Sequence, residues 1–135
     1  MLIQEVINDI EAAGIATFGV DMFGSLYPAD APTKCILIRE SSGPQPEKEL
    51  PIRYYMIQVL SRALYYPAAN EKSWEVYKRY HGERGAGGQW AGPHNYYLGD
   101  YYVQVSEALQ IPSDMSPDER GRSEVSFNIL FTVRI

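Results

Sequence analysis

Residues 123–135, SEVSFNILFTVRI, carry the pattern that decides the fold. Polar residues fill most alternate positions of this stretch, with Leu130 as the exception. The positions between them are apolar: Val125, Phe127, Ile129, Phe131, Val133 and Ile135. Successive side chains of a strand point to opposite faces, so the pattern predicts a long strand with one buried face and one largely solvated face. A strand of this length can also extend to a neighbouring subunit.

Two helices are expected upstream of this strand. Apolar residues at three- and four-residue spacing predict a helix over residues 2–13, and Gly14 suits its C-terminal end. A second helix is expected over residues 68–81, with Asn70 as its N-cap and Gly82 as its stop.

The remaining strands follow from runs of apolar, β-branched and aromatic residues. We expect them at residues 34–40, 52–64 and 96–108, with a further short strand possible within residues 16–27. Residues 41–51 and 82–93 are rich in glycine and proline, and we expect loops there. The order of elements predicts an α+β fold: a single-layer, mostly antiparallel sheet of about four strands with two helices packed on one face. We expect one domain over residues 1–135.

The chain has eleven tyrosines, many of them in adjacent pairs. A tyrosine pair on a strand places one ring on each side of the sheet, because side chains alternate. The ring packs while its hydroxyl can stay hydrated. One interpretation is that a helix covers one face of the sheet and another part of the chain covers some of the other. The alternative is that a second subunit covers the other face, because aromatic residues are enriched in protein interfaces.

Charge and composition exclude several classes of protein. A net charge of −5 disfavours general binding to nucleic acid, which needs basic residues for phosphate contact. No apolar run approaches the roughly 20 residues of a membrane-spanning helix, so no membrane partner is expected. The N-terminal residues do not resemble a signal peptide, and we expect the chain to fold in the cytoplasm. Cys35 is the single cysteine, and its apolar neighbours predict a buried structural thiol.

Residues that would indicate catalysis or a cofactor are missing. His81, His94 and Cys35 are too few for a zinc cluster, and their spacing fits no standard metal site. The glycine-rich segment 85–88 lacks the lysine and hydroxyl residue that complete a phosphate-binding loop. Carboxylates near residues 114–124 lie in expected turns, where acidic side chains are ordinarily solvated. We therefore expect no enzyme activity, no cofactor and no metal.

Several segments together carry a resemblance to a known family. They are residues 27–32 (YPADAP) followed by 35–40 (CILIRE), residues 51–62, residues 80–82 (YHG), and residues 118–124 (DERGRSE) followed by Ser126 and Asn128. In this layout the chain resembles the minor capsid and tail terminator proteins of bacteriophages with long, non-contractile tails. The glycine-rich segment 83–93 departs from the family pattern.

The resemblance implies a structural virion protein that is assembled in the host cytoplasm and lies at the head–tail junction. Such a protein caps the tail tube and joins it to the head as a homohexameric ring. The implied partners are further copies of the chain, the tail-tube protein and a head-completion or connector protein, while DNA only passes through the channel. Residues expected to contact a subunit or partner are Arg120, Arg122 and Glu124 in the charged turn, and Gly85, Gly87, Gly88 and Trp90 in the glycine-rich loop.

Two other functions stay open at this point. A head-to-tail connector or adaptor component would share the fold class and the virion location, and would bind on the portal side. A small ligand-binding module would use the tyrosines as a stacking surface and would remain monomeric. Binding to tail-tube protein and mass in solution distinguish these alternatives.

Overall fold

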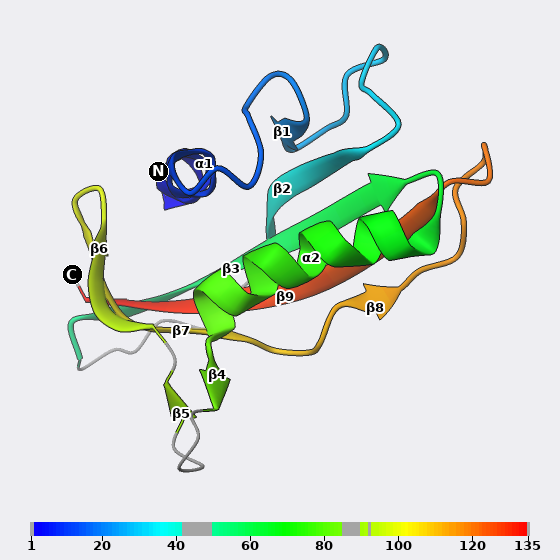
Figure 1. The fold of residues 1–135 in the computed structure, drawn as a ribbon. Coiled ribbons are helices and arrows are strands. Elements are labelled where there is room, and N and C mark those ends of the chain that lie inside the picture. Colours follow the sequence, from blue (N-terminus) through cyan, green and yellow to red (C-terminus); the bar gives the residue numbers. More distant parts are fainter. Residues whose placement is uncertain (1, 42–49, 85–89, 92, 135) are drawn as a thin grey trace.

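The structure is a computed structural model of the chain, and it describes residues 2–41, 50–84, 90–91 and 93–134 (Figure 1). Helix α1 spans Leu2–Ala12 and helix α2 spans Tyr66–His81. The strands in the described residues are β1 (Met22–Gly24), β2 (Cys35–Ser41), β3 (Ile52–Ala63), β4 (Glu83–Arg84), β5 (Trp90–Ala91), β6 (His94–Leu98), β7 (Tyr101–Ala108), β8 (Ser113–Asp114) and β9 (Ser123–Arg134).

The sheet is larger than the four strands that we expected, although the fold is α+β. In the described residues, seven strands form one mixed sheet in the order β1-β2-β3-β9-β7-β6, with β8 also paired to β9. Strand β1 runs parallel to β2, and the other pairs are antiparallel. Strands β1 and β8 have only three and two residues, which is too short for a periodic pattern to reveal.

The prediction of a single strand over residues 96–108 is wrong, because the chain reverses direction within this segment. Strands β6 and β7 form a hairpin in which Leu98 pairs with Tyr101, so Gly99 and Asp100 are the turn. Gly99 has φ of +58°, a left-handed conformation that glycine adopts without steric cost. The side chain of Glu5 in α1 also contacts the position that a Cβ of Gly99 would occupy. The Gly-Asp dipeptide was therefore the turn signal that the strand pattern obscured.

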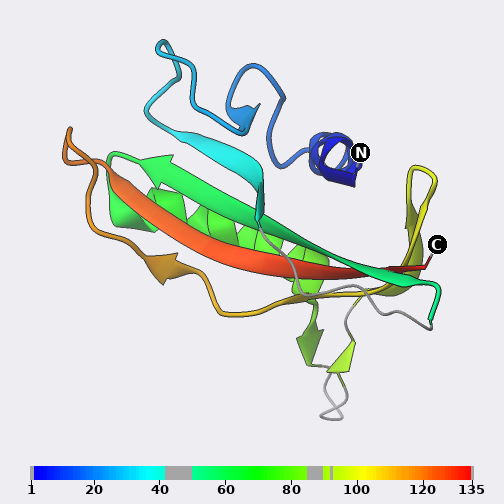
Figure 2. The ribbon, with the colours of Figure 1, turned by 180° about the vertical axis from the view of Figure 1, so that it is seen from behind.

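Strand β9 lies at the centre of the sheet, and its alternation is as expected. It pairs with β3 along its whole length. Its buried residues point to the helix-covered face. All of them except Val125 form one core with apolar residues of both helices, and Val125 packs in a small cluster with Ala63 and Ala69. Helix α2 lies across this face in Figure 1, whereas Figure 2, from the opposite side, shows β3 and β9 in front of it. The buried apolar side chains of β9 are Val125, Phe127, Ile129, Phe131 and Val133.

On the other face of the sheet, the described residues form a second, smaller apolar cluster at one end. Phe23, Leu37 and Leu60 form a second cluster there, against which Tyr27 and Ala31 pack. Among the described residues, segment 27–31 therefore covers part of this face, in line with the first interpretation of the tyrosines. The buried, unpaired thiol of Cys35 belongs to the same cluster, and its burial raises its pKa.

Hydrogen bonds between polar side chains also join helix α1 to helix α2. Asp9 in α1 accepts two hydrogen bonds from the guanidinium of Arg79 in α2, each 2.7 Å long. Its carboxylate also accepts a 2.5 Å bond from the hydroxyl of the buried Tyr80. Asp9, Arg79 and Tyr80 are called the helix clamp below.

The end of α2 is also fixed to the β6–β7 hairpin. The hydroxyl of Ser106 donates to the carbonyl of Tyr80, and the hydroxyl of Tyr96 donates to Ser106 Oγ. Burial raises the pKa of Tyr96 to about 12, although the hydrogen bond to Ser106 lowers it. Gly82 ends the helix as expected, since its N–H donates to the carbonyl of Lys78.

The expected loops are only partly within the described residues. Most of segment 41–51 and residues 85–89 and 92 lie outside them. Within segment 82–93, β4 and β5 pair as a short antiparallel hairpin, so the expectation of a loop is wrong for those four residues. No helix in the described part of the chain is long and apolar enough to span a membrane.

Candidate assembly interface

The charged turn at residues 118–122 is built around one carboxylate. Asp118 Oδ1 accepts hydrogen bonds from the backbone N–H groups of Arg120 and Arg122, at 3.0 and 2.9 Å. Its other oxygen accepts a 2.6 Å bond from Arg122 Nε. Desolvation raises the pKa of Asp118, but the bonds from Arg122 and Arg120 outweigh it, so this pKa lies below its ordinary value. The carboxylate thus holds the turn in a defined shape.

Arg62 and Tyr27 lie on the other side of the same region. The Arg62 guanidinium is 4.2 Å from the centre of the Tyr27 ring and donates to the carbonyls of Pro32 and Thr33. Arg62 is buried, and it pairs across β3 and β9 with Glu124. The Tyr27 hydroxyl is also buried, and it has no hydrogen-bond partner among the described residues. Burial raises its pKa.

A groove of about 410 Å³ separates these two walls. Segment 27–31 forms one wall and the charged turn forms the other, with Arg62 between them. Three arginines and three carboxylates balance one another in it, so the groove has no strong net charge. It suits hydrogen bonding with a protein surface better than capture of a free anion. Its lining residues are Tyr27, Pro28, Ala29, Ala31, Arg62, Asp118, Glu119, Arg120, Arg122 and Glu124.

Three residues that the sequence singled out line the groove, and each has different contacts there. Arg122 is tied to Asp118 within the turn. Glu124 is half-buried beside Arg62. Arg120 is exposed, and in the part of the chain that the structure describes its guanidinium forms no salt bridge. Arg120 is therefore the one of the three that is available to a partner.

The glycine-rich loop does not join this groove. Gly85, Gly87 and Gly88 lie outside the described residues. Trp90 belongs to β5, where it pairs with Arg84. Both views of the ribbon place β4 and β5 at the lower edge of the molecule, away from the turn at residues 118–122 (Figures 1 and 2). The two regions expected to contact partners are thus separate surfaces.

An exposed apolar run lies next to the groove and includes one of the tyrosine pairs, but the sequence did not place it among the candidate site residues. Leu64 and Tyr65 connect β3 to α2, and Tyr66 is the first residue of α2. The three side chains are between 43% and 71% exposed. They follow Ala63, which pairs with Ser123 just after the charged turn. Consecutive exposed apolar residues are unfavourable in a free chain unless they have a function. We call these three residues and the turn at 118–122 the distal end.

The start of α2 explains why this run was overlooked. Pro67 occupies the first turn of the helix, and Tyr65 is the N-cap. The expected N-cap, Asn70, is instead inside the helix, and its Oδ1 is buried without a partner among the described residues. Proline at the first helical positions was the available signal, because its ring fits there and it needs no N–H partner.

Replacing Tyr65 with aspartate is expected to stabilise the protein by about 1 kcal/mol. Within the described residues the Tyr65 side chain makes no capping hydrogen bond, whereas aspartate would accept one from the first turn of α2. Little burial is lost, since Tyr65 is among the most exposed apolar residues. Urea unfolding of Tyr65→Asp and Tyr65→Ala measures the effect, and equal stability of the two variants would contradict it.

The described residues contain no group of three or more histidine, cysteine, aspartate or glutamate side chains that could hold a metal ion. His81 instead accepts a hydrogen bond at Nδ1 from the backbone N–H of Ala108. It therefore helps to fix the end of α2 against β7.

Comparison with known proteins decides the family. A family model described as bacteriophage tail terminator protein matches residues 10–135. The chain belongs to this family. The match includes every element from the end of α1 onward, and so it includes both the groove and the distal end. Members of the tail terminator family are structural components of the phage virion. The comparison therefore confirms the expected resemblance and the expected location in the virion.

A solved structure supports the fold of this tail terminator family member. A chain from "Virion of native gene transfer agent (GTA) particle" matches with a TM-score of 0.64 and 10% sequence identity. The alignment covers 99% of this chain and 92% of that one. At this identity the likeness shows the fold alone. A search of curated proteins found no match.

Proposed function

We propose that this protein forms a ring that caps the tail tube and joins it to the head. Its partners would be further copies of itself in a hexamer, the tail-tube protein and a head-completion protein. The observation that carries this proposal is the distal end, where exposed aromatic residues adjoin the exposed Arg120 on a chain of the tail terminator family. Aromatic residues and arginine dominate the binding energy of protein interfaces.

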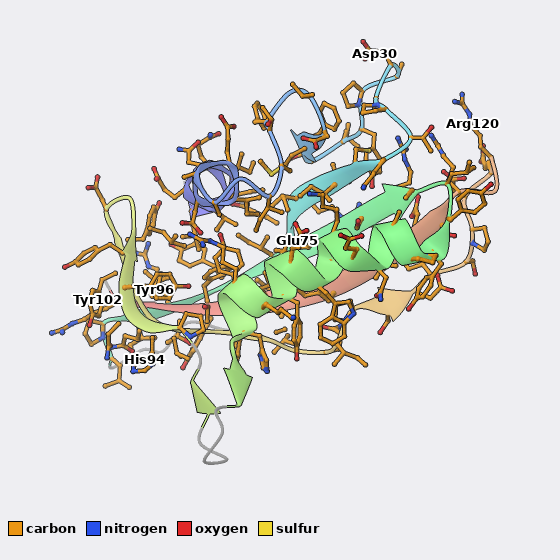
Figure 3. The ribbon with its side chains drawn as sticks, in the orientation of Figure 1. Asp30, Glu75, His94, Tyr96, Tyr102 and Arg120 are labelled. Carbon is orange, nitrogen blue, oxygen red and sulfur yellow. The ribbon has the colours of Figure 1, made fainter. Side chains whose placement is uncertain are left out.

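In this proposal the distal end contacts the tail-tube protein. Figure 3 shows Arg120 at one end of the molecule, and His94, Tyr96 and Tyr102 at the opposite end. A protein that joins two structures along an axis needs separate contacts at its two ends. The net charge of −5 suits a channel through which DNA passes, because it repels phosphate and opposes adhesion.

Arg120→Glu is expected to weaken binding to tail-tube protein at least tenfold while leaving the fold intact. The side chain is exposed and its backbone N–H, which caps the turn through Asp118, is kept. Reversal of Arg122 is a poorer test, because a glutamate there would face Asp118 and disrupt the turn. Titration of purified tail-tube protein measures the affinity.

The matched control for this experiment is Arg53→Glu. Arg53 is also exposed, but it lies at the start of β3, at the other end of that strand from the groove. The Arg53→Glu variant should bind the tail-tube protein with the affinity of the wild type. Equal affinity of Arg120→Glu and the wild type would count against the distal end as the tube contact.

A further inference from the structure

Exposed apolar side chains also gather along the edge of the sheet that β1 forms. Phe18 makes a bridge to Met22 at the start of β1, Val20 lies in the intervening turn, and Leu26 follows the strand. Phe18, Val20 and Leu26 are between 50% and 78% exposed. They are called the β1 edge.

A second apolar group lies along the segment that contains β8. Leu109 and Met115 are held beside β9, because their N–H groups donate to the carbonyls of Asn128 and Glu124. Ile111 lies between them. Leu109, Ile111 and Met115 are between 38% and 59% exposed, and they are called the β8 edge.

These two groups lie on opposite sides of the sheet's central strands. Strand β1 is reached from β9 through β3 and β2, whereas β8 pairs with β9 on its other side. Figures 1 and 2 both show β1 above and β8 below the central strands. The two edges also differ in sequence and in backbone structure.

Backbone pairing with another strand is disfavoured at both edges. Pro112 and Pro117 flank β8 and lack N–H donors. At the β1 edge, the carbonyl of Met22 already accepts a hydrogen bond from Gly19. Contact at either edge would therefore bury apolar side chains rather than extend the sheet.

We propose that the β1 edge of one copy of this chain binds the β8 edge of the next. This inference rests on the proposed ring. A contact between two different surfaces of identical subunits is heterologous, and repetition of such a contact closes a ring. The chain has the two surfaces that such a contact requires, on opposite sides of the central strands. Neither surface shares a residue with the distal end. A contact of one edge with itself would leave the other edge exposed.

Two complementary variants test this arrangement. The first, Val20→Asp with Leu26→Asp, disables the β1 edge, and the second, Leu109→Asp with Ile111→Asp, disables the β8 edge. All four residues are more than 45% exposed, so the fold should be kept, and circular dichroism checks this. Light scattering should show that each variant alone has the monomer mass of 15.3 kDa. Under the same conditions the wild type should form a ring.

An equimolar mixture of the two variants is the decisive sample. Each variant keeps the edge that the other lacks, so one intact contact can form between them. The mixture should give a heterodimer of about twice the 15.3 kDa monomer and nothing larger. A mixture that stays monomeric, variants that assemble like the wild type, or a wild type that is monomeric up to millimolar concentration would each overturn the inference.

Leu64→Asp separates this inference from the proposed function. Leu64 is similarly exposed but belongs to the distal end. This variant should form rings like the wild type and bind tail-tube protein more weakly. Rings that assemble through the two edges but never bind the tube protein would overturn the proposed function and leave the edge contact standing.

Discussion

Phe131→Ala is expected to lower the free energy of unfolding by about 3–5 kcal/mol. The Phe131 side chain is fully buried in the middle of β9, the strand that pairs with both β3 and β7. Its ring packs edge-to-face with Tyr80, with 5.4 Å between ring centres. The substitution removes apolar burial, leaves a cavity and loses this aromatic contact. Urea unfolding followed by tyrosine fluorescence measures the change.

Leu130→Ala is the matched control, because Leu130 is the next residue on the same strand. Its side chain points to the other face of the sheet and is only half-buried. We expect a loss of less than about 1.5 kcal/mol, since the neighbouring solvent can fill the space. Similar losses for the two variants would contradict the assignment of the buried face.

Asp9→Ala is expected to cost about 2–3 kcal/mol at neutral pH. The substitution removes the acceptor for both Arg79 and Tyr80, and so it opens the helix clamp. The Tyr80 hydroxyl would then be buried without its partner, and that desolvation is the larger part of the loss. Asp30→Asn, at an exposed loop residue, is the control and should leave stability unchanged.

The contribution of Asp9 should depend on pH. Burial raises the pKa of the carboxyl, but the hydrogen bonds from Arg79 and Tyr80 and the charge of Arg79 outweigh it, so the folded pKa lies below the ordinary value of 3.8. A carboxyl with a lowered folded pKa stabilises the protein above its unfolded pKa. This stability is lost as the pH falls through the folded pKa. The difference between wild type and Asp9→Ala should therefore be constant from pH 5 to 7 and shrink below about pH 4. A difference that persists unchanged at low pH would exclude this carboxylate as its source.

The local pattern of the sequence determined the type of the long elements. The alternation in residues 123–135 predicted β9, and strands β2 and β3 begin and end within one residue of the expected ranges. The stripe at residues 2–13 predicted α1 in the same way. Side-chain direction repeats with a fixed period in each element, so these features can be derived from neighbouring residues alone. The segments that resemble tail terminators also indicated the family that the comparison confirmed.

The local pattern could not predict the short strands, the turns or the start of α2. Strands β1 and β8 form because backbone groups of a neighbouring strand are available, and two or three residues have no period of their own. The hairpin between β6 and β7 depends on one glycine inside an apolar aromatic run. The start of α2 depended on Pro67, and Tyr65 took the capping position without a capping side chain.

Only the tertiary structure decided which distant residues meet. The sequence identified Arg120, Arg122 and Glu124 as neighbours, but not that segment 27–31 forms the opposite wall of their groove. Asp9 and Arg79 are 70 residues apart, and their pairing follows from how two helices pack on one face of the sheet. The two apolar edges likewise become opposite only once the strand order is known. Such contacts depend on the order and direction of packed elements, which the period of a single segment does not encode.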